Sequence, residues 1–155
     1  MTKILFICHG NICRSPMAEF CFRELVRQAG VHTRFEAASA AVSREELGAP
    51  MDPRAQRTLQ RHDVPFAPRS AQLMTKSDYD AYDLLLGMDR ENLRRMARIC
   101  GGDPAGKLRL LLDFTDAPRN VADPWYSGDF EAAWADIESG CRALLRALQA
   151  AEARL

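Results

Sequence analysis

The sequence predicts an α/β fold: a single doubly wound domain over residues 1–155, with a four-stranded parallel sheet and helices on both faces. Two observations predict it. Four short apolar runs alternate along the chain with segments of helical periodicity, which is typical of parallel strands joined by right-handed helical crossovers. No internal repeat, low-complexity tract or linker divides the chain, and 155 residues suffice for one hydrophobic core.

The first predicted unit is a strand, a tight loop and a helix. Residues 3–7 form a short β-favouring apolar run, the profile of a strand buried on both faces. After the loop, Ser15 and Pro16 are interpreted as the N-cap and the first position of a helix. Apolar residues recur at helical spacing from Met17, and Gly30 supplies a stop.

The rest of the chain repeats this order. Strands are predicted at 35–40, 83–88 and 108–112, and helices at about 52–62, 89–99 and 129–153. Asp52 before Pro53, and Asp89 before the next helix, are interpreted as N-caps. With Asn92, Asp89 is also expected to support the first loop from below. A long loop containing residues 123–126 separates the fourth strand from the last helix.

Composition and charge exclude several classes of function. Hydrophobic residues make up 47% and charged residues 27% of the chain, an ordinary globular mixture. Lysine plus arginine and aspartate plus glutamate number 21 each, so we expect no nucleic acid and no anionic membrane as a partner. The first apolar run is too short for a signal peptide, and no segment approaches the ~20 apolar residues of a membrane span. We therefore expect a cytoplasmic protein.

The five cysteines are predicted to be free thiols. Their odd number, without a signal peptide, argues against a disulfide framework. No Cys-x-x-Cys pair occurs and the three histidines are scattered, so we expect no metal site. Cys21, Cys100 and Cys141 fall at apolar positions of helical segments and are predicted to lie in the core.

The segment after the first strand carries the predicted chemistry. It consists of Cys8, His9, Gly10, Asn11, Ile12, Cys13, Arg14 and Ser15. Ligands of doubly wound folds bind where strands end, and this segment leaves the first strand and opens the first helix. Gly10 and Asn11 tolerate backbone conformations that point successive N–H groups inward as an anion nest. Arg14 adds a planar fork for two phosphate oxygens.

Cys8 is the candidate nucleophile. The nest, the helix N-terminus and Arg14 all favour thiolate over thiol, and a thiolate beneath a bound phosphoryl group is an activated nucleophile. Ser15 is placed to hydrogen-bond the sulfur and help it leave later. A bare Cys-x5-Arg pattern is weak, and the alternative is a buried cysteine at a strand end. The strand before it and the helix after it favour the catalytic interpretation.

Several motifs resemble those of the low-molecular-weight protein tyrosine phosphatases. Residues 7–19, Ile-Cys-His-Gly-Asn-Ile-Cys-Arg-Ser-Pro-Met-Ala-Glu, are similar to the signature of that family. Residues 52–54, 88–92 and 123–126 follow in the family's order, so the resemblance extends over nearly the whole chain. It implies a phosphocysteine intermediate, no metal or other cofactor, a phosphotyrosine-containing protein as substrate, and phosphate or a similar oxyanion held by residues 9–14. We expect a monomer or weak dimer.

The resemblance also implies a general acid, Asp123. A phenolate leaving group needs a proton, and Asp123 follows the last strand on a long loop restrained by Pro124. The alternative is a turn aspartate, which would be favoured if the loop at Cys8 were absent. Trp125 and Tyr126 are predicted to wall a cleft that admits a phenyl ring and excludes shorter phosphoserine. For Trp125, packing against the last helix is the alternative.

Three loop and rim residues add to the predicted site. Cys13 matches the family's second loop cysteine; two roles stay open, trapping an oxidised Cys8 as a reversible disulfide or filling space beneath the loop. Glu45 stands where a cleft tryptophan is often found, and His9 takes a position more often apolar or Thr. An acidic rim would disfavour acidic phosphopeptides or select basic ones.

Three other functions compete with this one. Thioredoxin-coupled arsenate reductase has a similar loop but needs two relay cysteines, and residues 75–92 contain none. Protein-arginine phosphatases tend to carry Thr where Ile12 stands, and Ile12 favours tyrosine. A non-catalytic phosphopeptide binder would be expected to lose the nucleophile or the acid, and both are present.

Overall fold

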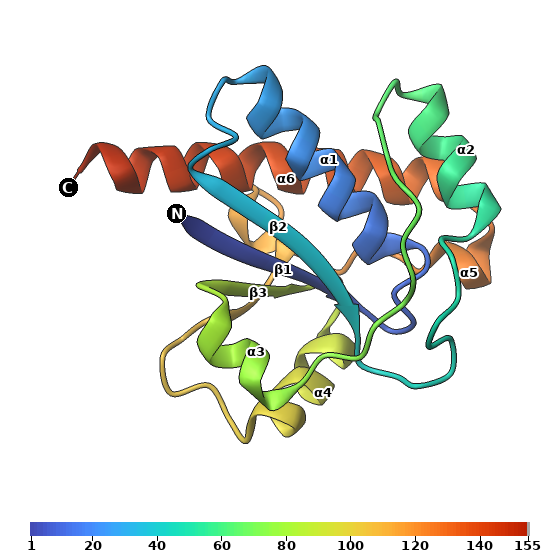
Figure 1. Cartoon of the computed structure of the whole chain (residues 1–155), viewed down its shortest axis with the longest axis horizontal. Helices are drawn as coiled ribbons and strands as arrows, with labels where there is room; N and C mark the ends of the chain where they lie inside the picture. Colours follow the sequence, from blue (N-terminus) through green and yellow to red (C-terminus); the bar gives the residue numbers. More distant parts are fainter. Residues whose placement is uncertain (155) are drawn as a thin grey trace.

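A sheet of four parallel strands forms the centre of the computed structural model, which describes residues 1–154 (Figure 1). The strands, in the order β2-β1-β3-β4 across the sheet, are β1 (Thr2–Cys8), β2 (Phe35–Ala41), β3 (Leu84–Gly87) and β4 (Leu108–Leu110). The helices are α1 (Arg14–Gln28), α2 (Pro53–Arg61), α3 (Lys76–Ala81), α4 (Arg90–Cys100), the 3-10 helix η1 (Leu111–Phe114), α5 (Pro124–Ser127) and α6 (Phe130–Ala153). The predicted α/β fold is confirmed.

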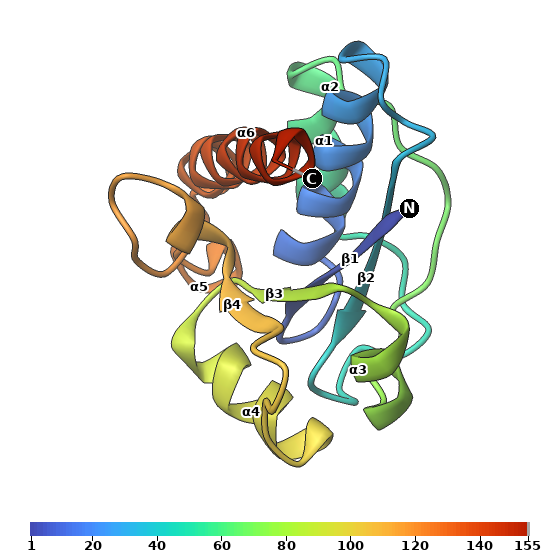
Figure 2. The same cartoon turned by 90° about the vertical axis from the view of Figure 1, so that its left-hand side faces the viewer.

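The central strand β1 packs on both faces. Its Ile4 and Phe6 belong to the hydrophobic cluster that includes residues of α1 and α6, whereas Leu5 and Ile7 belong to a second cluster with residues of α4. Figure 2 shows α1, α2 and α6 on one face of the sheet and α3 and α4 on the other. Since β1 pairs with β2 on one side and β3 on the other, its carboxyl end lies at the switch point where such folds bind ligands.

The N-caps predicted for α2 and α4 are confirmed. Asp52 Oδ1 accepts from the backbone N of Arg54 at 2.8 Å, and Asp89 Oδ1 accepts from the backbone N of Asn92 at 2.8 Å. The Arg54 guanidinium also holds the Asp52 carboxylate, with Nη2 2.9 Å from Oδ2. Burial alone would raise the pKa of Asp52, but the hydrogen bonds from Arg54 outweigh it and hold that pKa below its ordinary value.

Several details of the predicted elements are wrong. α1 begins at Arg14 with Cys13 as its N-cap, so Ser15, which was predicted as the cap, lies inside the first turn. Its hydroxyl contacts Cys8 instead. The fourth strand ends early because residues 111–114 close into η1. α3 and α5 were not predicted, since six and four residues are too few for helical periodicity to be visible.

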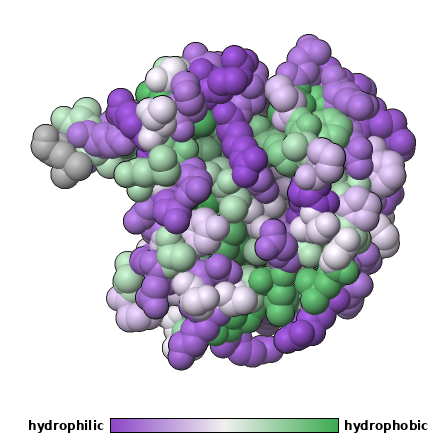
Figure 3. Space-filling model, viewed as in Figure 1, coloured by the Kyte–Doolittle hydropathy of each residue, from purple (hydrophilic) through white to green (hydrophobic). Residues whose placement is uncertain are grey.

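α6, with 24 residues the longest helix, crosses the sheet close to η1. An added Cβ on Gly140 would lie 2.6 Å from Leu111 Cγ, so this approach requires a residue without a side chain. None of the helices within residues 1–154 is both long and apolar enough to cross a membrane. The face drawn in Figure 3 is mostly hydrophilic, with smaller groups of hydrophobic residues between the polar ones.

Candidate active site

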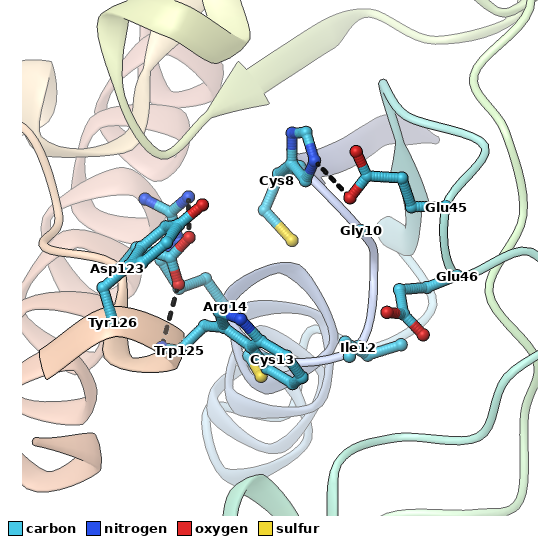
Figure 4. Close-up of a pocket in the computed structure, with 11 residues that line it drawn as sticks. Cys8, Gly10, Ile12, Cys13, Arg14, Glu45, Glu46, Asp123, Trp125 and Tyr126 are labelled. Atoms are coloured by element: carbon cyan, nitrogen blue, oxygen red, sulfur yellow. Dashed lines mark hydrogen bonds and ion pairs between the residues drawn. The ribbon is translucent and has the colours of Figure 1, made fainter. Parts of the chain in front are cut away.

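Three loops meet at the carboxyl edge of the sheet and enclose a pocket (Figure 4). The first loop follows β1, the second follows β2, and the third precedes α5. The pocket is lined by Cys8, His9, Gly10, Ile12, Cys13, Arg14, Glu45, Glu46, Asp123, Trp125 and Tyr126. The structure therefore brings the candidate nucleophile, the candidate acid and both predicted aromatic residues to one cavity, while Asn11 and Ser15 are fully buried behind it.

Cys8 lies at the end of β1, with donors around its sulfur. Cys8 Sγ is 3.0 Å from Ser15 Oγ, and the backbone N of Ser15 donates to it at 3.4 Å. Asn11 Nδ2 donates to the same Ser15 hydroxyl at 2.8 Å. A sulfur in this position, at the N-terminus of α1 and facing hydrogen-bond donors, is in the setting that favours a thiolate.

Arg14 is nearly inaccessible, with 2% of its surface exposed, and three acceptors fix its guanidinium. Nη1 donates to Asp89 Oδ2 at 2.9 Å and to the Val121 carbonyl at 2.7 Å, and Nη2 donates to Asp123 Oδ2 at 3.4 Å. A guanidinium has five N–H donors, so two remain for an oxyanion. Asp89 was expected to support the loop from below. Its carboxylate caps α4 and also holds the Arg14 guanidinium in place.

Asn11 and Gly10 shape the loop in different ways. Asn11 adopts the left-handed conformation, with φ of 60°, as its residue type allows. Gly10 is not among the residues with positive φ, so the prediction that it supplies an unusual backbone conformation is wrong. An added Cβ at this position would lie 3.2 Å from Cγ of Glu46, a tight contact that a small shift of the Glu46 side chain would have to relieve.

Asp123 and the two aromatic residues form the wall opposite the loop. Asp123 Oδ1 caps α5 by accepting from the backbone N of Trp125 at 3.1 Å. Trp125 and Tyr126 are 51% and 85% exposed, so they stand at the open mouth of the pocket. The Arg54 guanidinium lies 5.5 Å from the Trp125 ring centroid and 4.7 Å from that of Phe130 in α6, so Trp125 both lines the pocket and is braced toward the last helix.

The two loop cysteines differ in their surroundings. Burial raises the pKa of the Cys13 thiol well above its ordinary value, and the nearby charges of Asp52, Cys8 and Asp123 raise it further against the opposing effect of Arg54. The Cys13 sulfur therefore has to lose its proton before it can attack another group. The remaining free cysteines, Cys21, Cys100 and Cys141, are buried as predicted.

The rim of the pocket combines acidic and basic side chains. His9 Nε2 lies 3.2 Å from Glu45 Oε2, and its Nδ1 lies 3.2 Å from Arg95 Nη1. Glu46 lies beside Gly10 and also lines the pocket. Within residues 1–154, no group of three or more His, Cys, Asp or Glu side chains is arranged to hold a metal ion.

Sequence reasoning missed three residues that hold the site together. Val121 and Glu46 lie in irregular segments and belong to no motif. Arg69, also in an irregular segment, donates from Nη2 to Asn11 Oδ1. Only contacts in three dimensions identify such residues, because Arg69 is 58 positions from Asn11 in the chain.

Comparison with known proteins gives a consistent result. The family model described as low molecular weight phosphotyrosine protein phosphatase matches residues 3–154. The chain is 34% identical over 151 residues to the low molecular weight protein-tyrosine-phosphatase YfkJ of Bacillus subtilis, covering 96% of this chain and 97% of that protein. It is 37% identical over 148 residues to the human low molecular weight phosphotyrosine protein phosphatase, covering 92% and 93%.

Solved structures agree. The crystal structure of YfkJ from B. subtilis superposes with a TM-score of 0.93, over 96% of this chain and 95% of that one. Wzb of Vibrio vulnificus, solved in complex with benzylphosphonate, superposes with a TM-score of 0.82 at 26% identity, over 94% and 97% of the two chains.

Proposed function

The chain belongs to the low molecular weight phosphotyrosine protein phosphatase family, and from this premise we propose that it hydrolyses phosphotyrosine in proteins through a phosphocysteine on Cys8. One observation carries the proposal. Cys8 and Asp123 line the same pocket, with the fixed guanidinium of Arg14 beside them. A nucleophile, an oxyanion holder and a proton donor at one point are the set that a phosphoryl transfer from an aryl ester needs.

In the first step, the Cys8 thiolate attacks phosphorus and the bond between phosphorus and the phenolic oxygen breaks. The two free N–H donors of Arg14 and the loop amides hold the three equatorial oxygens, where charge spreads in the transition state. Asp123 acts in its carboxylic acid form and gives its proton to the departing phenolate. The phenol leaves and Cys8 carries the phosphoryl group.

In the second step, the Asp123 carboxylate takes a proton from water as that water attacks phosphorus. The P–S bond breaks, inorganic phosphate forms, and the Cys8 thiolate is regenerated. The Ser15 hydroxyl, 3.0 Å from the sulfur, stabilises the leaving thiolate. Asp123 ends protonated, ready for the next cycle.

The aromatic mouth supports phosphotyrosine as the substrate. Trp125 and Tyr126 line the same pocket as Cys8, so a flat ring between them would place its phosphate at the loop. A phosphoserine side chain is shorter and would not reach from the same peptide position. The binding of benzylphosphonate, an aromatic phosphonate, by the relative Wzb is in keeping with this preference.

The proposal is tested by turnover of an aryl phosphate, with and without orthovanadate and a chelator. We expect hydrolysis that vanadate inhibits and the chelator leaves unchanged, loss of turnover in Cys8→Ser, and full activity in the control Cys100→Ser, which changes a thiol at the far end of α4. Phosphotyrosine peptides should be hydrolysed faster than matched phosphoserine or phosphoarginine peptides. If the chain binds phosphotyrosine peptides without hydrolysing them, it is a phosphotyrosine-binding protein and not an enzyme.

Cys13 is proposed to protect the nucleophile. A peroxide converts the Cys8 thiolate to a sulfenic acid, and attack by the Cys13 sulfur then forms a disulfide and releases water. Both cysteines line one pocket, which supports this pairing. Peroxide-treated wild type should recover activity with a thiol reductant, whereas treated Cys13→Ser should recover much less; equal recovery would assign Cys13 to packing alone.

A further inference from the structure

Arg69 is a charged side chain near the nucleophile that the proposed reaction does not use. It lies in the irregular segment between α2 and α3, and its Nη2 donates to Asn11 Oδ1. Its other terminal nitrogen, Nη1, is buried and has no hydrogen-bond partner within residues 1–154. A buried N–H group without a partner costs stability, so packing alone gives little reason for an arginine here.

The segment that carries Arg69 is held rigidly against the site. The backbone of Ala71 exchanges hydrogen bonds with the loop after β2, donating to the Ala49 carbonyl at 2.8 Å and accepting from the Gly48 N at 3.0 Å. The Gln72 carbonyl accepts from the backbone N of Ala41, at the end of β2, at 2.7 Å. These hydrogen bonds fix the backbone that follows Arg69 against the loop after β2 and the end of β2.

The hydrogen bonds from Arg69 to Cys8 share one direction. Asn11 Oδ1 accepts from Arg69 and from the backbone N of Gln72 at 3.1 Å, which places the Asn11 amide nitrogen toward Ser15. Asn11 Nδ2 then donates to Ser15 Oγ at 2.8 Å. Since that oxygen already accepts a hydrogen bond, its own proton is available for Cys8 Sγ, 3.0 Å away. With the Ser15 hydroxyl donating to Cys8 Sγ, each hydrogen bond of the series runs toward the sulfur.

We propose that Arg69 is a positioning residue that directs the Asn11–Ser15 relay toward Cys8, so that the Ser15 hydroxyl donates to the sulfur and stabilises its thiolate. The proposal rests on the proposed function, because it takes Cys8 as the nucleophile. A positive charge at the start of the series polarises each hydrogen bond in the sense that stabilises a negative charge at its end. The effect is on the electronic state of Cys8, and Arg69 itself does not touch the substrate.

Charged and titratable side chains other than Arg69 surround both ends of the relay, and the test has to leave them unchanged. The pocket places His9, Cys13, Arg14, Glu45, Glu46 and Asp123 around Cys8. Burial lowers the pKa of Arg69, and the charges of Glu19 and Cys8 oppose that change, so the guanidinium remains a cation. Arg69 does not line the pocket, so its substitution changes none of these residues and removes its charge together with its hydrogen bond to Asn11 Oδ1.

The first experiment measures how the rate of Cys8 alkylation by iodoacetamide depends on pH, with the modified residue located by mass spectrometry. In Arg69→Met we expect the midpoint to move to higher pH by about one unit, a roughly tenfold loss of alkylation rate below the wild-type midpoint. The acid limb of kcat/KM for an aryl phosphate should move by the same amount. Arg69→Lys should keep much of the wild-type profile, and Arg146→Gln, an exposed arginine of α6, should match wild type.

The same Arg69 substitution in a Ser15→Ala protein distinguishes an effect through the relay from a direct effect of the Arg69 charge on Cys8. In Ser15→Ala the relay is cut, so adding Arg69→Met should change the midpoint little; additive shifts would mean that Arg69 acts by another route and would overturn the relay. Thermal melting identifies a structural role: we expect a melting temperature within a few degrees of wild type or above it. A strongly destabilised Arg69→Met would assign Arg69 a structural role and refute the proposal, as would a wild-type midpoint in folded Arg69→Met. If Cys8→Ser still turns over substrate, the proposed function fails regardless of Arg69.

Discussion

Replacement of Asp123 by asparagine tests the proposed acid with little disturbance of the fold. The Asp123 side chain has two structural tasks, the cap on α5 through the backbone N of Trp125 at 3.1 Å and the contact with Arg14 at 3.4 Å. Asparagine caps helices as well as aspartate does, so α5 should keep its place. Arg14 retains two shorter hydrogen bonds, so we expect a loss of about 1 kcal/mol or less and a melting shift of no more than about 4 °C.

The catalytic loss should be much larger than this structural one. General acid catalysis contributes about 10²–10⁴-fold, equivalent to roughly 3–5 kcal/mol in the barrier for a phenol that leaves poorly. The loss should shrink for nitrophenyl esters, because a phenolate that is already stable needs little help from a proton. The expected signature is therefore a dependence on the leaving group that is steeper in Asp123→Asn than in wild type.

The assay is kcat/KM for a series of aryl phosphates that spans phenols of different acidity, measured for both proteins at one pH. Asp123→Ala is the matched comparison, since it removes the acid and the cap together and should lose about 1 kcal/mol more stability. An Asp123→Asn protein that hydrolyses every ester at the wild-type rate would refute the reasoning. So would a loss that is equal for all leaving groups, because it would point to a binding role.

Three other changes test the fold and the site. Asp89→Asn keeps the cap on α4 but weakens a charge-assisted hydrogen bond to Arg14. The inhibition constant for phosphate should therefore rise by roughly 10–100-fold. An unchanged inhibition constant would contradict this. Because its hydrogen bonds lower the pKa of Asp52, the ionised carboxylate stabilises the fold above about pH 4, and this contribution is lost as pH falls through the folded pKa. The urea midpoints of wild type and Asp52→Asn should therefore differ at pH 7 and converge in acid; a constant difference would exclude the ion pair as its cause. Gly140→Ala should lower the free energy of unfolding in urea by about 1–3 kcal/mol through overpacking, although alanine favours helices. Ser139→Ala, at the exposed neighbouring position, is the control and should not destabilise the fold. Equal urea midpoints for the two variants would show that the close contact is not needed.

The fold could be predicted from local patterns because its main elements carry strong local signals. Residues 4–7 of β1 form a continuous apolar run that leads into the loop at Cys8. Asp52 and Asp89 precede helices with the residue types that cap them. Short elements lack helical periodicity: α5 has four residues, and only its start, Asp123 followed by Pro124, carries a helix signal.

The candidate site divides in the same way. Cys8, Arg14 and Ser15 could be placed because a single loop carries them, between a strand and a helix. The partners that orient them could not, since the Arg14 contacts with Asp89 and Val121 span 75 and 107 positions of the chain. Asp89 lies between β3 and α4 and Val121 in the irregular segment between η1 and α5, and only the parallel order of the strands brings them together.

The error at Ser15 has a physical cause. Serine before proline at a helix start is a common N-cap signal, but here the turn begins earlier, and Cys13 occupies the cap position without a side-chain hydrogen bond. The first turn keeps Ser15 beside Cys8 Sγ, so its hydroxyl is used at the sulfur rather than at the backbone. The N-cap preference of serine is therefore not used at Ser15, because its hydroxyl contacts the Cys8 sulfur instead.

The central claim is that Cys8 carries the phosphoryl group. The most direct measurement is rapid acid quenching of the wild-type protein during turnover of an aryl phosphate, followed by peptide mapping of the phosphorylated residue by mass spectrometry. We expect a transient phosphocysteine at Cys8, absent from Cys8→Ser and formed without any added metal. Turnover with no covalent intermediate at Cys8, or with the phosphoryl group on another residue, would contradict it.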